Sequence, residues 1–321
     1  MRPTVAAILG LSALFVGNAA VTPHAPVVRR LRGVIYSVID GYRPLRADLF
    51  LPRVHRLPAP VIVYLHGGGW TLDPHGDEGL AGDATMRALA GKGYVVVRPE
   101  YRLSSEARFP AQLIDAKRAI RWIKTHAAEY GADPHRVMVW GSSAGGTLAS
   151  LVGVTCGIAR FDDAAALPQH FGLSTPPIAP DTNSCVTAVV DWFGPVDFPR
   201  MDAQARPGSP LRHDAADSAE SRLIGCALPD CPRERVMAAS PLSYVSRDDP
   251  PFLILHGDAD NAVPHQQSEE LAAALRAKGV PVEFGLVPGA DHMFDKASER
   301  LRRKQVARTF AFLDAHRALT R

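Results

Sequence analysis

The chain has few features of proteins that work on membranes or nucleic acids. After residue 20, no apolar run in its 321 residues is long enough for a membrane-spanning helix, which needs ~20 apolar residues. Lysine and arginine number 36 against 33 for aspartate and glutamate, and the positive residues are spread along the chain. The densest basic stretch, residues 302–304, falls in a helical pattern and fits a solvated helix face. The sequence therefore indicates no nucleic-acid partner and no stable membrane insertion.

Cysteine is also scarce, and its arrangement argues against a metal site. The chain has four cysteines, which are Cys156, Cys185, Cys226 and Cys231. They form no CxxC pair and have no histidine nearby at ligand spacing. Four cysteines allow three pairings in an oxidising compartment. We favour Cys226 with Cys231, which closes a small local loop, and Cys156 with Cys185.

The N-terminus has a pattern of its own. Arg2 is the only charged side chain before Arg29, an apolar run covers residues 5–16, and small residues follow at 17–20. This pattern is typical of a secretory signal peptide. We expect a signal peptide at 1–19, a single domain at 20–321, and a secreted or periplasmic protein. An uncleaved membrane anchor is the alternative.

The rest of the chain alternates between apolar runs and helical patterns. The expected strands are 61–65, 94–97, 136–140, 188–192, 252–255 and 282–287. Each run is nearly continuous in apolar residues, which favours strands covered on both faces in a parallel sheet. The expected helices are 113–127, 271–278 and 298–318. This alternation predicts an α/β fold with a mostly parallel, doubly wound sheet, preceded by an extended lead-in at 20–34.

Two long excursions interrupt the alternation. Residues 157–187 are rich in Asp, Pro, Ser and Thr, and residues 199–240 contain a Pro-Gly-Ser-Pro turn and two of the cysteines. Long excursions in compact domains are usually functional or disordered. Both are expected at the carboxyl edge of the sheet, where ligands bind. We interpret the second as a small cap, and the first is a candidate for the same role.

The strongest chemical signal is the pentapeptide Gly-Ser-Ser-Ala-Gly at residues 141–145. It matches G-x-S-x-G with Ser143 at its centre, between an expected strand and a helix of small residues. The turn is tight, so its flanking positions must be small, and the serine oxygen projects into the cleft. Ser142 is the rival nucleophile, but Trp140 and Ala144 in the flanking positions break the pattern.

A glycine run follows the strand that ends at residue 65, in the sequence His-Gly-Gly-Gly-Trp. Glycines there let the backbone approach a substrate and turn N–H groups toward a carbonyl oxygen. We expect Gly68, Gly69 and Ala144 to form an oxyanion hole, although which two glycines of the run donate stays open. A flexible turn is the alternative interpretation.

A nucleophilic serine needs a base and an acid, which follow it in the order acid then base on this fold. His292 lies in a loop after the strand 282–287 and is the expected base. The acid is Asp258 or Asp260, in the loop after the strand 252–255. We favour Asp260 because it lies farther out on the loop, with Asp258 capping the turn. Asp291 reads as a turn residue.

Three further residues are candidates for the substrate pocket. Trp70 follows the glycine run, Ser142 precedes the nucleophile, and Trp192 ends an expected strand. For Trp192 and its neighbour Phe193, packing in the core is the favoured alternative.

Several motifs occur together in order, from HGGGW through WGSSAGG and VVDWFGPVDF to HGDADNAVP and GADHMF. Over residues 32–316 the chain resembles the BD-FAE-like α/β-hydrolases, feruloyl and acetyl esterases near the hormone-sensitive-lipase-like carboxylesterases. The resemblance implies Ser143, Asp260 and His292 as a catalytic triad, the HGGG loop as oxyanion hole, and no cofactor. The cysteines and the cap region depart from the family pattern, which leaves the substrate open.

These features together predict a serine hydrolase that cleaves short-chain or aryl esters of the acetyl or feruloyl type. The partner would be a small-molecule or polymer-linked ester, and the oligomeric state is open. An amidase or peptidase on the same fold is the alternative. A non-catalytic binding module is a third possibility, although such proteins typically lack a member of the triad.

Overall fold

The computed structural model describes residues 28–53, 58–73, 79–162 and 176–317. The expected signal peptide at 1–19 lies outside these residues. The described strands are β1 Arg29–Ser37, β2 Leu45–Leu51, β3 Ala59–Leu65, β4 Val95–Pro99, β5 Ala132–Ser142, β6 Val189–Trp192, β7 Phe252–Gly257 and β8 Val282–Val287. They form one eight-stranded sheet in the order β1-β2-β4-β3-β5-β6-β7-β8.

The sheet is mostly parallel, as the sequence predicts. The pairs β1/β2 and β2/β4 are antiparallel, and β3 to β8 pair in parallel. The six expected strands correspond to β3 through β8. The lead-in expected at 20–34 is corrected in part, because residues from Arg29 onward belong to β1. This edge strand carries three arginines and is half exposed, so it lacks the apolar run of an inner strand.

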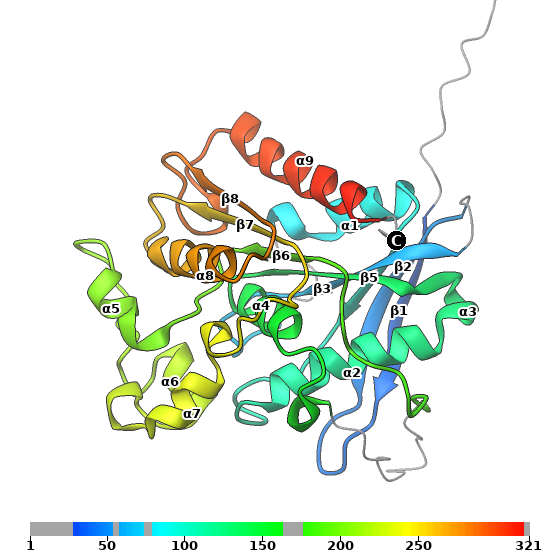
Figure 1. Cartoon of the computed structure of the whole chain (residues 1–321), viewed down its shortest axis with the longest axis horizontal. Helices are drawn as coiled ribbons and strands as arrows, with labels where there is room; N and C mark the ends of the chain where they lie inside the picture. The colour runs from blue at the N-terminus through cyan, green and yellow to red at the C-terminus, as the bar shows by residue number, and fades with distance from the viewer. Residues whose placement is uncertain (1–27, 54–57, 74–78, 163–175, 318–321) are drawn as a thin grey trace, which may run out of the picture.

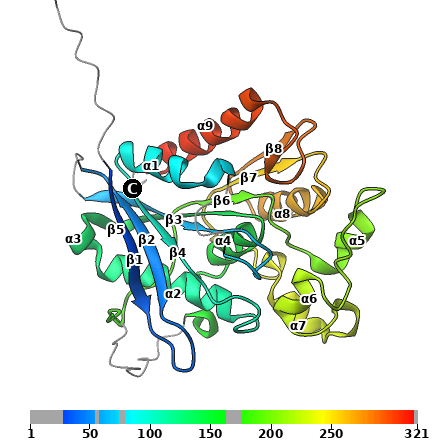
Figure 2. The same ribbon diagram turned by 180° about the vertical axis from the view of Figure 1, so that it is seen from behind.

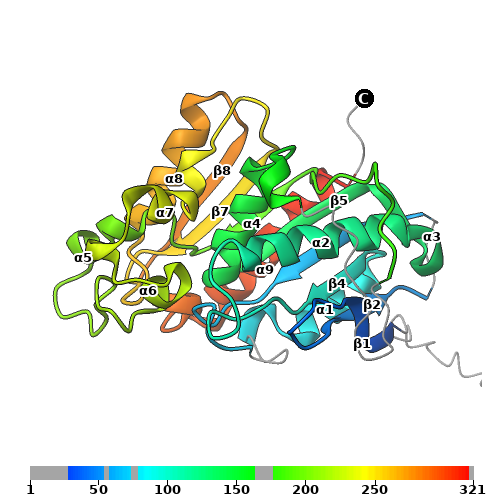
Figure 3. The same ribbon diagram turned by 90° about the horizontal axis from the view of Figure 1, so that it is seen from below.

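Helices cover both faces of the sheet. The described α-helices are α1 Asp83–Gly91, α2 Ala111–Thr125, α3 Ala127–Tyr130, α4 Ala144–Val154, α5 Met201–Gln204, α6 Ala219–Ile224, α7 Arg233–Ala238, α8 Gln266–Ala277 and α9 Glu299–Ala315. Helices α2, α4 and α8 pack on one face, and α1 and α9 pack on the other (Figures 1 and 3). Each face has its own buried apolar cluster, so the sheet lies between two helical layers. No helix formed by the described residues is long and apolar enough to cross a membrane.

The parallel strands bring distant loops to one edge. Strands β3, β5, β7 and β8 run in the same direction, so the segments after Leu65, Ser142, Gly257 and Val287 leave the sheet on the same side. These segments carry the glycine run, the G-x-S-x-G serine, the acidic loop and the histidine loop. The topology therefore collects every expected catalytic group at the carboxyl edge.

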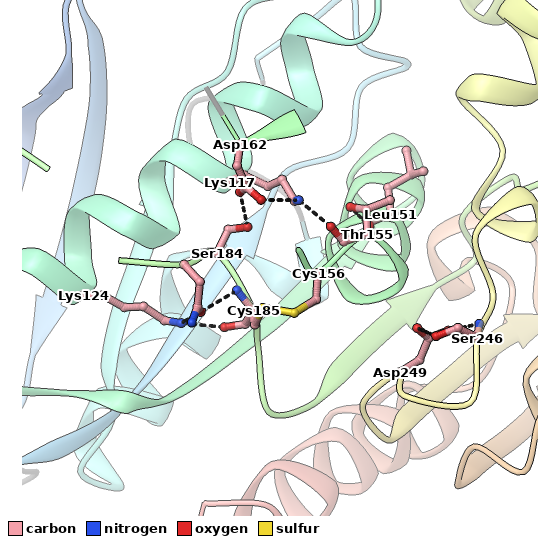
Figure 4. Close-up of a disulfide and its surroundings, with 11 residues drawn as sticks. Lys117, Lys124, Leu151, Thr155, Cys156, Asp162, Ser184, Cys185, Ser246 and Asp249 are labelled. Atoms are coloured by element: carbon pink, nitrogen blue, oxygen red, sulfur yellow. Dashed lines mark hydrogen bonds and ion pairs between the residues drawn. A yellow bond between two sulfur atoms is a disulfide. The ribbon is translucent and has the colours of Figure 1, made fainter. Parts of the chain in front are cut away.

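The described part of the first excursion lies elsewhere. Residues 176–187 run along the C-terminal half of α2, where Lys124 Nζ donates to the carbonyl of Cys185 at 2.6 Å and Arg121 Nε donates to that of Thr182 at 2.9 Å. A disulfide joins Cys185 to Cys156 beyond the end of α4 (Figure 4). Because α4 begins beside Ser143 and leads away from it, this part of the excursion does not cap the site. Residues 163–175 lie outside the described chain.

The second excursion borders the carboxyl edge. It contains α5, α6 and α7, which group at one end of the molecule (Figures 1 and 2), and the disulfide Cys226–Cys231. Arg206 donates to the carbonyl of Asp258 at 3.0 Å, and Ser209 Oγ donates to that of Asn261 at 2.9 Å. Residues 199–240 therefore brace the acidic loop from the side. Both disulfides have the pairing favoured from the sequence.

Candidate active site

Ser143 occupies a strained turn between β5 and α4, with φ of 52° and ψ of −122°. Its two flanking glycines are required by close backbone contacts. A Cβ on Gly141 would lie 2.0 Å from the carbonyl oxygen of Gly145, and one on Gly145 would lie 2.1 Å from that of Leu65. The G-x-S-x-G spacing therefore follows from the tightness of the turn, which holds Ser143 at the carboxyl edge.

Three side chains from separate loops meet at this turn. His292 Nε2 lies 3.0 Å from Ser143 Oγ, and His292 Nδ1 lies 2.7 Å from Asp260 Oδ2. With the proton on Nδ1 shared with the carboxylate, Nε2 is the acceptor that faces the serine hydroxyl. The Asp260 side chain is fully buried, whereas His292 keeps 22% of its side chain exposed. Asp260 thus fixes the imidazole from the protein side.

The carboxylate of Asp260 is held at both oxygens. Oδ1 accepts the backbone N–H groups of Ala262 and Val263, each at 2.8 Å. Burial acts to raise the pKa of Asp260, but hydrogen bonds from His256 and His292 outweigh it and hold that pKa well below the usual range. The group therefore stays ionised. The rival acid, Asp258, accepts the N–H of Gly289 at 2.7 Å and acts as a turn cap.

Asp291 ties the acidic loop to the histidine loop. Its Oδ1 accepts the N–H groups of Asn261 and His292 at 2.9 and 2.8 Å, and its Oδ2 accepts from Lys296 at 2.5 Å. Burial acts to raise the pKa of Asp291, but these hydrogen bonds outweigh it and lower that pKa to about 2. Asp291 is therefore a loop residue, as the sequence indicates, and it joins the loop of Asp260 to the loop of His292.

The glycine run has the backbone form that only glycine adopts readily. Gly68 has φ of 103°, and a Cβ on it would lie 2.5 Å from the carbonyl oxygen of Leu72. The Tyr101 ring stacks on the ring of His66 with centroids 4.1 Å apart, and its hydroxyl donates to the His66 carbonyl at 2.9 Å. Trp70 Nε1 donates to the carbonyl of Ala144 at 3.1 Å. These contacts fix the loop against the first turn of α4.

A cavity of about 510 Å³ opens above the serine. The described residues that line it are Gly67, Gly68, Gly69, Leu72, Asp73, Ser142, Ser143, Phe193, His292 and Met293. Two of them are exposed apolar side chains, Leu72 at 67% and Met293 at 38%. The cavity therefore joins the serine, the histidine and the glycine run to an apolar rim.

Comparison with known proteins identifies the family. The BD-FAE family model matches residues 47–275. The chain belongs to the BD-FAE family. The esterase LipC and the probable carboxylic ester hydrolase LipM of Mycobacterium tuberculosis are each 32% identical to it over 239 residues, 74% of this chain. These matches cover 54% of LipC and 50% of LipM, so the chain spans about half the length of the curated relatives it matches.

Solved structures agree with this BD-FAE assignment. A truncated carbohydrate esterase from gut microbiota is 29% identical, with a TM-score of 0.71 over 92% of this chain and 98% of its own. A bifunctional GH43-CE protein of Bacteroides eggerthii is 30% identical, with a TM-score of 0.72 over 89% of this chain and 38% of its own. The α/β-hydrolase fold expected for this BD-FAE protein is therefore confirmed.

Two tryptophans proposed for the substrate pocket lie in the core of this BD-FAE protein instead. Trp70 and Trp192 are each 1% exposed and are not among the described residues that line the cavity. Trp70 turns toward α4 and packs on Phe198. Trp192 points to the α9 layer, where its Nε1 donates to Thr309 Oγ1 at 3.0 Å. Ser142 does line the cavity, and its hydroxyl is 2.8 Å from that of Tyr64.

Phe193, the residue after Trp192, lines the cavity beside His292, which the sequence did not predict. Phe193 has φ of 45°, lines the cavity, and places its ring edge against His292 with centroids 4.8 Å apart. Its position just beyond a strand at the carboxyl edge is the signal that could have identified it. Leu72 and Met293 carried no such signal, because they are apolar residues in loops.

Proposed function

We propose that this protein is a serine carboxylic-ester hydrolase that cleaves short-chain or aryl esters of the acetyl or feruloyl type. The supporting observation is the hydrogen-bonded series Ser143, His292 and Asp260, with contacts of 3.0 and 2.7 Å at the floor of a cavity. The relatives named above as esterases support the same chemistry.

In the first half of the reaction, Ser143 attacks the ester carbonyl. His292 takes the hydroxyl proton at Nε2, and Asp260 holds the imidazole in the required tautomer and stabilises its positive charge. The proton then passes from Nε2 to the leaving alcohol. A covalent acyl-serine remains.

The attack places negative charge on the carbonyl oxygen, which needs hydrogen-bond donors. We assign this role to the backbone N–H groups of Gly68, Gly69 and Ala144. The N–H of Ala144 belongs to the first turn of α4, where helical N–H groups lack partners within the helix. Losing one such donor costs about 3–4 kcal/mol of barrier. Water activated by His292 then releases the acid and regenerates Ser143.

The cavity and its apolar rim suit an ester whose acyl group is compact or aromatic. Its volume of about 510 Å³ suits one small ligand. The apolar rim at Leu72 and Met293 supports an aryl or alkyl group at the mouth. The carbohydrate esterase among the structural neighbours supports a sugar-linked ester as the natural substrate.

Two disulfides support an oxidising location. Cys156–Cys185 and Cys226–Cys231 account for all four cysteines of the chain. Such bonds persist in secreted or periplasmic proteins and are rare in the cytosol. Together with the N-terminal pattern, they support secretion or export to the periplasm.

The test is a Ser143→Ala variant assayed with p-nitrophenyl acetate and with a fluorophosphonate label. We expect turnover and labelling to disappear while the circular dichroism spectrum is retained. Ser243→Ala is the matched control, because the described partner of its hydroxyl is the carbonyl of Met237, outside the cavity. Activity retained in Ser143→Ala would overturn the proposal. Absence of labelling in the wild type would favour a binding module, and faster cleavage of anilides than of esters would favour an amidase.

A further inference from the structure

A second histidine reaches the carboxylate of Asp260. His256 lies in β7, one residue before its end, and is fully buried. Its Nδ1 is 2.7 Å from Ser268 Oγ on α8, and its Nε2 is 2.9 Å from the carbonyl oxygen of Val263. The same Nε2 lies 3.2 Å from Asp260 Oδ2, the oxygen that His292 also contacts.

The surroundings of His256 determine where its proton lies. Both neighbours of Nε2, the carbonyl of Val263 and the carboxylate of Asp260, are acceptors, so Nε2 must carry a hydrogen. In the Nε2–H tautomer, Nδ1 accepts from the hydroxyl of Ser268. That hydroxyl is completely buried, and this bond gives its proton a partner.

Asp260 therefore sits between two serine–histidine pairs. Ser143 and His292 approach it from the cavity, and Ser268 and His256 approach it from the interior. We propose that His256 is a positioning residue, oriented by Ser268, which donates Nε2–H to Asp260 and moderates the negative charge that the carboxylate presents to His292. This inference rests on the proposed function of the triad.

The charge on Asp260 is the quantity that His256 controls. A carboxylate oxygen shared between two donors attracts each proton less than one with a single donor. Removing His256 leaves His292 as the only side-chain donor described at Oδ2. The protonated form of His292 then becomes more stable, and the enzyme needs a higher pH to keep this base neutral.

Among the described residues, the ionisable groups around His256 come from the two triad loops and from the neighbouring strand. Asp260 and His292 approach it from the two loops, and Asp191 lies on the neighbouring strand β6. Burial raises the pKa of Asp191, while hydrogen bonds from Ser150 and the N–H of Gly194 and the nearby His256 lower it. Asp191 is fully buried, and its partners Ser150 and Gly194 are unchanged in every variant below. The loss of its interaction with the His256 ring is common to His256→Phe and His256→Gln, so the comparison of these two variants isolates the hydrogen bond to Asp260.

The experiment compares pH profiles of kcat/KM for p-nitrophenyl acetate. His256→Phe removes the donor and keeps an aromatic ring in the core. His256→Gln keeps an amide N–H near the position of Nε2. Ser268→Ala removes the group that orients the ring. His316→Gln is the matched control, since the described contacts of the His316 ring are with Phe312 on α9 and include no member of the triad.

We expect the acid limb of the profile to move to higher pH by roughly 0.5–1 unit in His256→Phe, which is the effect of one hydrogen bond on a neighbouring protonation equilibrium. Ser268→Ala shifts it less in the same direction. His256→Gln retains the acid limb at the wild-type pH, and His316→Gln changes neither the acid limb nor kcat/KM. A folded His256→Phe with the wild-type acid limb would overturn the proposal, because a residue that only fills the core lowers stability without moving the limb.

A measurement on the wild type keeps the proposal testable if His256→Phe does not fold. Long-range ¹H–¹⁵N correlation spectra of histidine distinguish the two neutral tautomers. His256 is expected as the Nε2–H form, and an Nδ1–H form contradicts the proposal. Failure of this inference can be told apart from failure of the proposed function. If only the inference fails, Ser143→Ala is inactive and His256→Phe keeps the wild-type acid limb. If the proposed function fails, Ser143→Ala stays active.

Discussion

The two serine–histidine pairs that meet at Asp260 have the same chemistry and opposite surroundings. His292 lies in a short 3₁₀ turn, His292–Phe294, and keeps 22% of its side chain exposed. His256 lies in a regular strand and is fully buried. Ser143 is held in a strained turn with φ of 52°, whereas Ser268 lies within the regular helix α8.

The difference shows why we assign catalysis to only one of the two pairs. Hydrogen-bond distances do not separate them, since the serine–histidine contact is 3.0 Å in the exposed pair and 2.7 Å in the buried one. Access and backbone position separate them. Only the outer pair borders the cavity and the glycine run, where a carbonyl group could meet both a nucleophile and oxyanion donors.

The largest expected contrast comes from making the same substitution in both pairs. His292→Gln should lower kcat/KM by about 10⁴- to 10⁶-fold, because the base is lost. His256→Gln should lower it by less than about 10-fold, because a donor to Asp260 is retained. Steady-state kinetics with p-nitrophenyl acetate measures both. Equal losses in the two variants would mean that the comparison between an outer reactive and an inner positioning histidine is wrong.

The next substitution affects both pairs at once. Asp260→Asn should reduce kcat by about 10⁴-fold, because a neutral amide no longer selects the His292 tautomer that accepts from Ser143. It should also lower the melting temperature, since the amide places a donor or a weaker acceptor against His256 and His292.

Asp258→Asn is the matched control for Asp260→Asn, two residues away in the same loop. Asp258 bonds only the N–H of Gly289 among the described contacts of its carboxylate. We expect less than about a threefold change in kcat, in line with one turn hydrogen bond outside the reacting groups. A comparable loss of kcat in both variants would mean that the structure of the whole loop, rather than the carboxylate of Asp260, supports catalysis.

A third prediction concerns stability at acid pH. The pKa of Asp260 is held below the value of an unfolded aspartate, ~3.9. A depressed pKa in the folded state contributes stability above the unfolded value, and that stability is lost as the pH falls through the folded value. The loss amounts to about 1.4 kcal/mol for each unit of depression.

The measurement is urea unfolding of the wild type and of Asp260→Asn from pH 6 to pH 2. The gap in unfolding free energy between them should narrow as the pH falls below ~4, because only the wild type must protonate this carboxylate. Asp291, with a pKa lowered to about 2, contributes equally to both proteins and cancels in the difference. A gap that stays constant would show that the two histidines do not stabilise the ionised form.

The outer pair was largely predictable from sequence, and the inner pair was not. Ser143 lies in a turn so tight that glycine is needed on both sides, and such steric demands leave a pattern in the sequence. His292 follows a strand at the carboxyl edge in the order that the fold requires. His256 ends a buried run and reads as a strand residue, because its partner Ser268 joins it only through the packing of α8 on β7.

The directions of two side chains explain why the residues expected to line the cavity differ from those that do. Trp192 and Phe193 are adjacent, yet one points to the α9 layer and the other borders His292. A strand alternates sides only while it is regular, and the positive φ of Phe193 breaks that alternation at the edge. Both rings belong to the same buried cluster, 6.2 Å apart, whereas regular alternation would place them on opposite faces. The sequence shows two buried aromatics there and carries no sign of the backbone change that places Phe193 beside His292.

Phe193 also gives the smallest of the expected effects and the finest test of the comparison. Its ring packs edge-on against His292 at 4.8 Å and against His256 at 6.3 Å. Phe193→Leu keeps an apolar lining but removes the aromatic contacts, each worth ~0.5–1.5 kcal/mol. We expect kcat to fall by roughly 2- to 10-fold with little change in KM, because the loss affects the orientation of the outer imidazole.

Phe284→Leu on β8 is the control for Phe193→Leu, because this half-buried ring packs against the apolar core on the α2, α4 and α8 face. It should cost stability without affecting kcat. If Phe193→Leu instead raises KM and spares kcat, the ring serves the substrate rather than the histidine. His292 would then be positioned by Asp260 without help from the aromatic ring, and His256 by Asp260, Ser268 and Val263. The difference between the outer and inner pairs would arise from their exposure.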